Sequence, residues 1–234
     1  KSVPVATEEG QLTEGKAEFL LESLNHSDEA FYPYAYVNQG KGFCGQTPEL
    51  LFNLRKGRLN TMALAGTARA EERVVFACDE KEIREHEFVA QTLVAKLSDI
   101  GAVSRAQRSI MDLGQLVHFH TSIEVELFAT RGVDELIRRL HHTPALGPLP
   151  RTEETLRMLA DWRQRMHCPE KFGAPFGLLK DGTFRAVVAI RGIHWNGAEV
   201  AIPSGCGVIE ASRLVNEWRE LRLKREAVKA AFRL

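Results

Sequence analysis

Hydrophobic residues return at helical spacing in several long segments of the chain. The pattern predicts helices over residues 14–25, 80–99, 132–141, 152–166 and 211–232. Within the second segment, Ile83, Val89, Leu93, Leu97 and Ile100 line up as one apolar stripe. Such a stripe is typical of a helix with one face packed on a core.

Shorter runs with β-branched or alternating residues separate these helices. They predict strands over residues 33–38, 42–45, 50–54, 58–64, 103–110, 115–128, 183–191 and 198–202. Asp181-Gly182 and Asn196-Gly197 favour tight hairpins, because such pairs adopt the positive φ angles that two-residue turns require. Clustered strands with helices between the clusters predict an α+β fold with large antiparallel sheets. Residues 143–151 (TPALGPLPR) follow neither period and predict a loop inside one domain that spans 1–234.

The composition narrows the classes of function. The 234 residues include 31 basic and 31 acidic ones, so no basic excess is available to neutralise phosphates and we expect no nucleic-acid partner. No apolar run reaches the roughly 20 residues of a membrane span, and no signal-peptide pattern opens the chain. The four cysteines lie far apart without a C-x-x-C pair, which indicates neither disulfides nor a thiolate metal site. We therefore expect a cytoplasmic protein without a membrane partner.

Two predicted helices each carry a pair of acids on one face. Glu82 and Glu85 are three residues apart, and Glu217, Glu220 and Lys224 follow the same helical period. Most such pairs are solvated surface. The sequence SGCG at 204–207 precedes the last helix, with Ser212 as its expected N-cap, and its small residues let backbone N–H groups approach an anion. A carboxylate ligand there, beside glutamates from two helices, would complete an oxygen site suited to Mg²⁺.

Two other positions are candidates for binding an anion. Gly66 and Thr67 end a predicted strand, where a glycine permits close backbone approach, although a simple turn explains it equally well. Arg191 closes the apolar run VVAIR. Its guanidinium is either a surface charge at a strand end or a bidentate clamp for a carboxylate.

Eight blocks, taken together and in order, carry a family resemblance. They are FCGQTPELLF (43–52), ALAGTARA (63–70), EIREHEF (82–88), LVHFHTS (116–122), LHHTPALGPLP (140–150), VVAIRG (187–192), SGCGVIEAS (204–212) and NEWRELRLK (216–224). This set resembles the chorismate-utilising enzymes, which include isochorismate synthase, salicylate synthase and the synthase components of anthranilate and aminodeoxychorismate formation. The resemblance implies the family's α+β fold and the absence of an upstream portion found in the family.

The resemblance also implies roles for individual residues. It makes Glu85 and Glu220 the ligands of Mg²⁺, with Glu82 and Glu217 as outer or water-mediated partners. Glu49, from T-P-E, becomes the general acid that protonates a departing hydroxyl. The residues implied to bind substrate are Gly66, Thr67, His118, Arg191, Gly205, Gly207 and Lys224.

The residue at position 1 would determine whether water or ammonia is the nucleophile. In isochorismate and salicylate synthases a lysine opens the early strand and serves as the base that activates water. The start KSVPVA resembles that pattern, and burial would lower the pKa of the amine enough for this task. The alternative is that Lys1 is a frayed terminal residue without a role in the reaction.

The predicted function is therefore that of an isochorismate synthase, an isomerase that converts chorismate with Mg²⁺ in menaquinone or siderophore biosynthesis. A monomer without an obligatory glutaminase subunit is expected. Salicylate synthase, an ammonia-using synthase component and a non-catalytic chorismate-binding domain remain alternatives. The departures from the family pattern at Leu50, His142 and Phe172 favour the last of these modestly, and Pro148 is a further departure. Ser204 and Cys206 replace alanines and bear on substrate fit.

Overall fold

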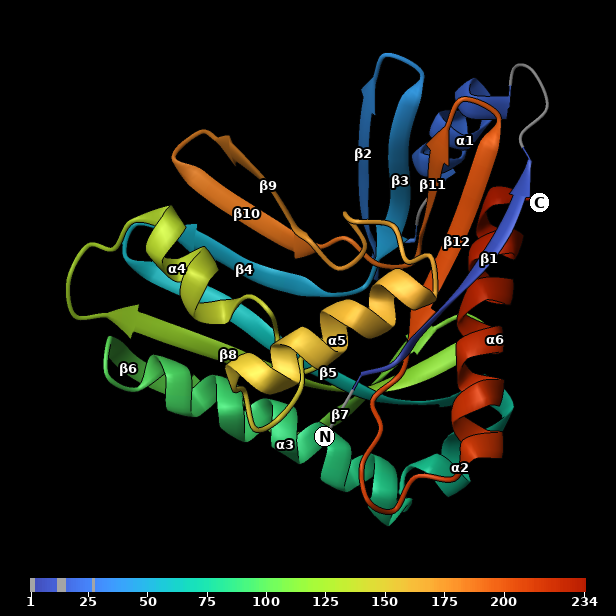
Figure 1. The fold of residues 1–234 in the computed structure, drawn as a ribbon. Coiled ribbons are helices and arrows are strands. Elements are labelled where there is room, and N and C mark those ends of the chain that lie inside the picture. Colours follow the sequence, from blue (N-terminus) through green and yellow to red (C-terminus); the bar gives the residue numbers. More distant parts are fainter. Residues whose placement is uncertain (1–2, 12–15, 27) are drawn as a thin grey trace.

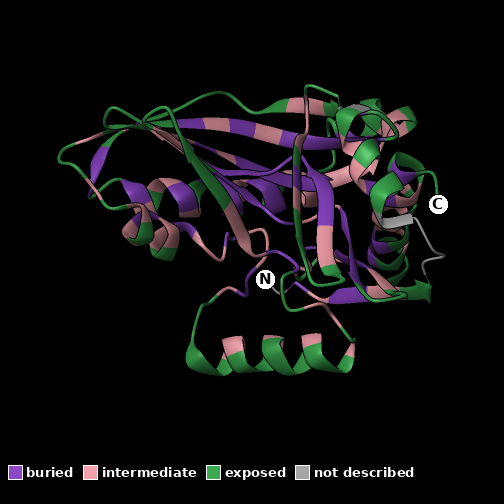
Figure 2. Ribbon diagram, turned by 90° about the horizontal axis from the view of Figure 1, so that it is seen from above, coloured by how far each residue is buried: buried purple, intermediate pink, exposed green. Residues whose placement is uncertain are grey.

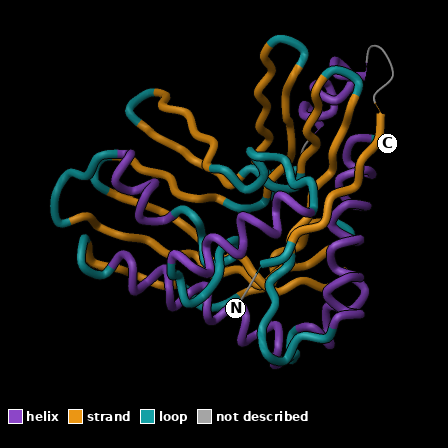
Figure 3. The backbone as a smooth tube through the Cα atoms, viewed as in Figure 1, coloured by secondary structure: helices purple, strands orange, loops and turns teal. Residues whose placement is uncertain are grey.

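A computed structural model describes residues 3–11, 16–26 and 28–234. Within this part of the chain, the strands form two antiparallel sheets with helices packed against them (Figure 1). The tube in Figure 3 shows how the strands gather in these two groups while loops connect them at the edges. The predicted α+β fold with large antiparallel sheets is confirmed.

The first sheet has five strands. In spatial order they are β1 (Val5–Gln11), β12 (Glu199–Gly205), β11 (Gly192–Asn196), β3 (Lys41–Thr47) and β2 (Tyr32–Asn38). Helices α6 (Leu214–Phe232) and α1 (Lys16–Ser23) pack beside it, and the 3₁₀ turn Leu24–His26 follows α1. Leu20, Val228 and Phe232 are buried against Ile193 and Ile202 of this sheet. These contacts fix α6 along the sheet.

The second sheet is larger and has a helix below it. Its strands are β6 (Gly101–Arg105), β8 (Leu116–Leu127), β5 (Arg58–Arg69), β4 (Leu50–Arg55), β10 (Thr183–Val188) and β9 (Pro175–Lys180), with β7 (Ser109–Leu113) paired to β8. Helix α3 (Glu80–Leu97) packs on β5 and β8, and α4 (Val133–Leu140) joins the same core. Three further helical segments are Ala70–Glu72, α2 (Arg73–Phe76) and α5 (Glu153–Arg165). No residue of α5 is buried, and this helix lies on the outside of the fold in Figure 2. It contacts the first sheet where Trp162 Nε1 donates to Val5 O of β1 at 3.2 Å.

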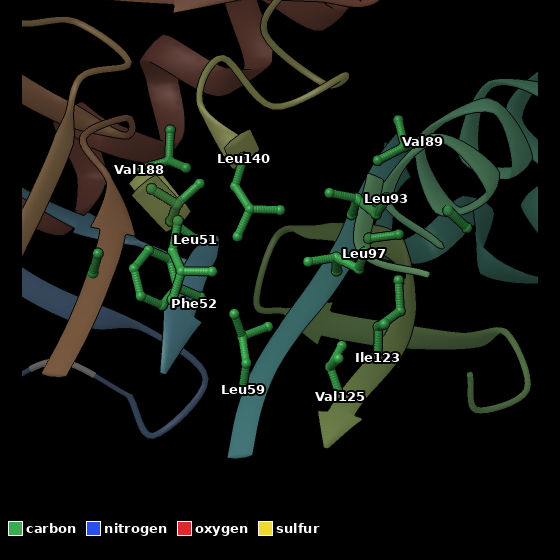
Figure 4. Packing of buried hydrophobic residues seen from close by; sticks show 14 of the residues in the cluster. Leu51, Phe52, Leu59, Val89, Leu93, Leu97, Ile123, Val125, Leu140 and Val188 are labelled. Carbon is green, nitrogen blue, oxygen red and sulfur yellow. The ribbon is translucent and has the colours of Figure 1, made fainter. Parts of the chain in front are cut away.

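The apolar stripe of α3 forms the main core. Val89, Leu93, Leu97 and Ile100 are each at most 2% exposed, as the spacing predicts, whereas Ile83 is only partly buried. Figure 4 labels Val89, Leu93 and Leu97 in the cluster that they form with side chains from β4, β5 and β8. A fully buried Leu or Ile side chain contributes about 1.5–3 kcal/mol. Asp79 caps the helix by accepting a hydrogen bond from Glu82 N at 3.0 Å, which fixes where its first turn begins.

The chain crosses from one sheet to the other at two adjacent places. Pro48 and Glu49 connect β3 to β4, and residues 189–191 connect β10 to β11. The crossings are joined by backbone hydrogen bonds from Gln46 N to Arg191 O (3.2 Å) and from Val188 N to Glu49 O (3.0 Å). Glu49 and Arg191 are therefore held where the two sheets meet.

Several predicted elements need correction. The strand expected at 183–191 ends at Val188, because the chain leaves the sheet and Arg191 takes a positive φ of 56°. The strand expected at 103–110 is two strands, β6 and β7. The sequence pattern missed β1, β9, β11 and α2. Ser212 is not the N-cap of α6, because the helix begins at Leu214 after Arg213, and the Ser212 hydroxyl instead accepts from Ile209 N.

Candidate active site

A cavity with polar and apolar walls lies where the two sheets meet. It is lined by the crossings, β5, β8, α3, α6 and the loop around residues 145–146. The sequence-predicted residues at its wall are Glu49, Gly66, Thr67, Glu85, His118, Arg191, Gly205, Gly207, Glu220 and Lys224. Glu82 and Glu217 line a second cavity, which shares Thr67 and Glu220 with the first. Lys1 lies outside the described residues.

Glu49 is a buried carboxylic acid, 4% exposed, held by its own turn and by a distant loop. Its backbone N–H donates to Thr47 Oγ1 at 3.2 Å. The hydroxyl of Thr143, which is also buried, donates to Glu49 Oε1 at 2.9 Å. Thr143 stands in the loop predicted at 143–151, so this loop carries a residue that orients the acid as well as residues that line the cavity.

His118 and Arg191 form a hydrogen-bonded pair at the cavity wall. The guanidinium always donates, so Arg191 Nη2 donates to His118 Nε2 at 2.6 Å. The proton of the imidazole therefore sits on Nδ1, which donates to Gly66 O at 2.7 Å and lies 3.1 Å from Thr67 Oγ1. Burial, aided by the charge of Arg191, lowers the pKa of His118, so this ring stays neutral. Burial also lowers the pKa of Arg191 to about 10, which leaves the guanidinium charged at neutral pH.

Gly66 interrupts β5 with a β-bulge, where the pairing with β8 shifts between Ala65 and Thr67. Its φ is +78°, and a Cβ there would lie 3.2 Å from Glu82 O and from the Phe119 ring. Glycine is therefore suited to this position, because it adopts the positive φ of the bulge and lets the backbone of β5 approach α3 closely. The bulge directs Thr67 N toward Glu82 Oε2, to which it donates at 2.9 Å.

The acids of α3 and α6 converge at the boundary of the two cavities. Glu85 and Glu217 are each 5% exposed, and Lys224 Nζ lies 2.5 Å from Glu220 Oε1 and 2.8 Å from Gly205 O. Burial raises the pKa of Glu82 to about 7. For Glu220, burial is outweighed by the ammonium of Lys224, and the pKa is lowered. The alternative that these glutamates are solvated surface is therefore wrong.

The donor set at this boundary fits a hard cation such as Mg²⁺. Glu85 and Glu220 line the same cavity with carboxylate oxygens, and Glu217 Oε2 is buried and accepts no hydrogen bond from the described residues. Within those residues, no three His, Cys, Asp or Glu side chains are grouped as a complete protein-only metal site. Mg²⁺ sites commonly use one or two carboxylates and take their remaining oxygens from substrate and water.

Two contributors to the site were not predicted. Lys81 lies among three of the glutamates, and Thr143 holds Glu49. A signal for Lys81 was its spacing of four residues from Glu85. Nothing local in the sequence connects Thr143 to a residue 94 positions away. Phe172, noted as a departure, is 4% exposed and adds an apolar ring to the cavity wall.

The two-sheet fold is that of chorismate enzymes of known structure. The structure titled MenF, the menaquinone-specific isochorismate synthase from Escherichia coli, matches 99% of this chain and 56% of its own with a TM-score of 0.80 at 19% identity. Anthranilate synthase component I from Streptococcus pneumoniae matches 99% of this chain and 53% of its own, with a TM-score of 0.73 at 18% identity. At these identities the likeness establishes the fold.

Sequence comparison then fixes the family. The family model described as chorismate binding enzyme matches residues 10–233, and the chain belongs to this family. Isochorismate synthase MenF of Bacillus subtilis is 27% identical over 220 residues, which cover 88% of this chain and 45% of that protein. Isochorismate synthase EntC of Escherichia coli K12 is 27% identical over 227 residues, 92% of this chain and 57% of that protein. The chain spans about half the length of these relatives. None of the described helices is both long and apolar enough to cross a bilayer.

Proposed function

We propose that this chain is an isochorismate synthase-like enzyme, and that residues 1–234 act as one chorismate-binding catalytic domain. Chorismate is a dianion with a ring carboxylate and an enolpyruvyl carboxylate. The observation that carries the proposal is one cavity that combines a buried acid, Glu49, with a guanidinium, an ammonium and two carboxylates from separate elements. The isochorismate synthases among its relatives support the same reaction.

Glu49 would act as the general acid. In the reaction, water adds to the ring at C2 while the hydroxyl at C4 departs, so the product is an isomer of the substrate. Hydroxide is a poor leaving group, and a proton donated by Glu49 would let it leave as water. A positioned acid accelerates such a step by roughly 10² to 10⁴. The burial of Glu49 and its hydrogen bond from Thr143 support a fixed direction for this proton.

The cations and the backbone of the cavity would hold the substrate. Arg191 is suited to the enolpyruvyl carboxylate, because a guanidinium can donate two parallel hydrogen bonds, and the backbone at Gly205 and Gly207 would complete that end. Gly66, Thr67 and His118 would line the ring end of the cavity. The neutral His118 fixes Arg191 through its Nε2 without adding a repelling charge. The ammonium group of Lys224 would attract a carboxylate of the substrate.

Glu85 and Glu220 would bind Mg²⁺ directly, and Glu82 and Glu217 would be outer or water-mediated partners. Bound Mg²⁺ would neutralise the ring carboxylate and draw electron density from the ring. The carboxylates supply hard oxygen donors and leave coordination positions for substrate and water. The buried oxygen of Glu217 without a hydrogen-bond donor supports a cation in this region.

The base that activates water is assigned to Lys1, and this stays a prediction from the resemblance. Its support is the position of the residues that follow it. Val5 pairs with Gly205 across β1 and β12, and Pro4 O accepts from Cys206 N at 3.3 Å. The described start of the chain therefore runs beside the glycine segment of the cavity wall.

The test is incubation of the chain with chorismate and Mg²⁺, followed by chromatography of the products. Glu49→Gln should lower turnover by 10² or more while chorismate still binds, because the amide keeps the shape but cannot donate the acid proton. Glu210→Gln, a change of the same kind at an exposed position, is the control. Full turnover by Glu49→Gln would refute the acid assignment.

The products also decide between the alternatives. Isochorismate alone supports the proposal, salicylate with pyruvate would indicate a salicylate synthase, and an aminated product with ammonium would indicate an ammonia-using component. Mg²⁺-dependent chorismate binding without any product would identify a non-catalytic binding domain. We also propose that the protein is cytoplasmic and that it acts as a monomer without a glutaminase subunit. Sedimentation of the active chain would test the monomer.

A further inference from the structure

The ammonium group of Lys81 contacts acids of both α3 and α6. Its Nζ lies 2.8 Å from Glu82 Oε1, 2.9 Å from Glu217 Oε1 and 3.4 Å from Glu85 Oε2. The Lys81 side chain is 17% exposed, and the three carboxylates are 13%, 7% and 6% exposed in the same order. The ammonium therefore joins α3 to α6 in a region that water reaches poorly.

Lys81 lowers the excess of acidic over basic side chains at this junction. Four acids, Glu82, Glu85, Glu217 and Glu220, face the ammonium groups of Lys81 and Lys224. An excess of two acids over lysines remains. Without Lys81 three would remain, and buried charges that lack a partner are costly.

The Lys81 side chain is held in place by its own helix and by its ion pairs to Glu82 and Glu217. Because Lys81 precedes Glu85 by one turn of α3, its stem follows the helix surface to the glutamate. Its position is thus fixed by the helix and by the partner carboxylate on α6.

We propose that Lys81 is a resident counter-ion, which holds the carboxylates of α3 and α6 together. This positioning role rests on the proposed function only in assigning the single metal to Glu85 and Glu220. Lys81 contacts neither reacting atoms nor, in this proposal, the substrate. Its effect is to set the charge that the metal meets.

The test is Lys81→Met, which keeps the length of the stem and removes the charge. The metal-free variant should melt roughly 10 °C lower than the unaltered chain, because breaking a buried ion pair is strongly destabilising. MgCl₂ should raise its melting temperature more than that of the unaltered chain, and calorimetry should give a Kd for Mg²⁺ at least about tenfold lower, because one repelling charge is gone. Lys171→Met, at an exposed lysine, is the control.

A double variant keeps the proposal falsifiable if Lys81→Met does not fold. Lys81→Met with Glu217→Gln removes one charge of each sign and should restore the metal-free melting temperature and the Mg²⁺ affinity toward the unaltered values. The proposal is overturned if Lys81→Met matches the unaltered chain in both readouts, or if the double variant is no more stable than Lys81→Met. If the unaltered chain binds no Mg²⁺, the metal assignment fails, whereas the two melting temperatures without metal still test the counter-ion.

Discussion

The hydrogen bond from Thr143 to Glu49 should set how well the acid works. Thr143→Val keeps the shape of the side chain and removes the hydroxyl that donates to Glu49 Oε1 at 2.9 Å. Glu49 becomes a carboxylate as its proton leaves, and a hydrogen bond to a charged group contributes about 1.5–3 kcal/mol. Both residues are buried, so water replaces this bond poorly. If half or more of this energy orients the acid in the transition state, kcat should fall by about 4- to 160-fold.

The assay is steady-state turnover of chorismate with Mg²⁺ across pH 6 to 9. Thr143→Val should lower kcat with little change in KM, and it should shift the limb of the pH profile that reports the acid. Thr143→Ser restores the hydroxyl and should recover most of the rate, which a purely structural role of the methyl group would not allow. Unchanged kcat in Thr143→Val, or a Ser variant as slow as Val, would refute the reasoning.

Three further predictions concern stability and the site. Burial lowers the pKa of His194 to about 4. The contribution of its neutral ring to the free energy of unfolding is therefore complete above pH 6.5 and is lost as the pH falls toward 4. Urea unfolding should show about 2 kcal/mol less stability from this residue at pH 5 than at pH 7.5, and His194→Phe should flatten that slope. Gly66→Ala should reduce kcat/KM at least tenfold, because its Cβ meets neighbours at 3.2 Å, whereas Gly57→Ala, also at φ +78° but with open space, should leave activity unchanged. EDTA should abolish turnover and excess MgCl₂ restore it, with Glu85→Gln needing more Mg²⁺; activity in EDTA would contradict the metal assignment.

The long helices could be predicted because their period does not depend on the rest of the fold. The stripe from Val89 to Leu97 appears in the sequence and is buried in the structure. The strands were harder. Leu178 and Leu179 of β9 are both 67% exposed, so no alternation marks that strand. Around Ile190 the sequence is apolar on both sides of a sheet crossing, and hydrophobicity alone cannot show where the chain leaves one sheet for the other.

The candidate site could be predicted only in part. Most of its residues were first singled out by their spacing and type, and the family resemblance gave them roles. The structure places ten of the predicted residues around one cavity. Local spacing alone did not separate Glu82 and Glu85 from ordinary surface acids. Lys81 and Thr143 act on residues of other elements, and such contacts depend on how α3, α6 and the 143–151 loop pack. Tertiary packing, rather than local pattern, decides these roles.

The two sheet crossings have a consequence for how this site could change its chemistry. The Arg191 carbonyl accepts from Gln46 N of β3 and the Glu49 carbonyl accepts from Val188 N of β10, so the backbone of each residue is hydrogen-bonded to the strand that enters the other crossing. The segment that carries Thr143 is different, because it lines the cavity with Ala145 and Leu146 without belonging to either sheet. Redesign of the product should therefore begin after Thr143, at Ala145 and Leu146, where side chains can change while Thr143 still holds the acid.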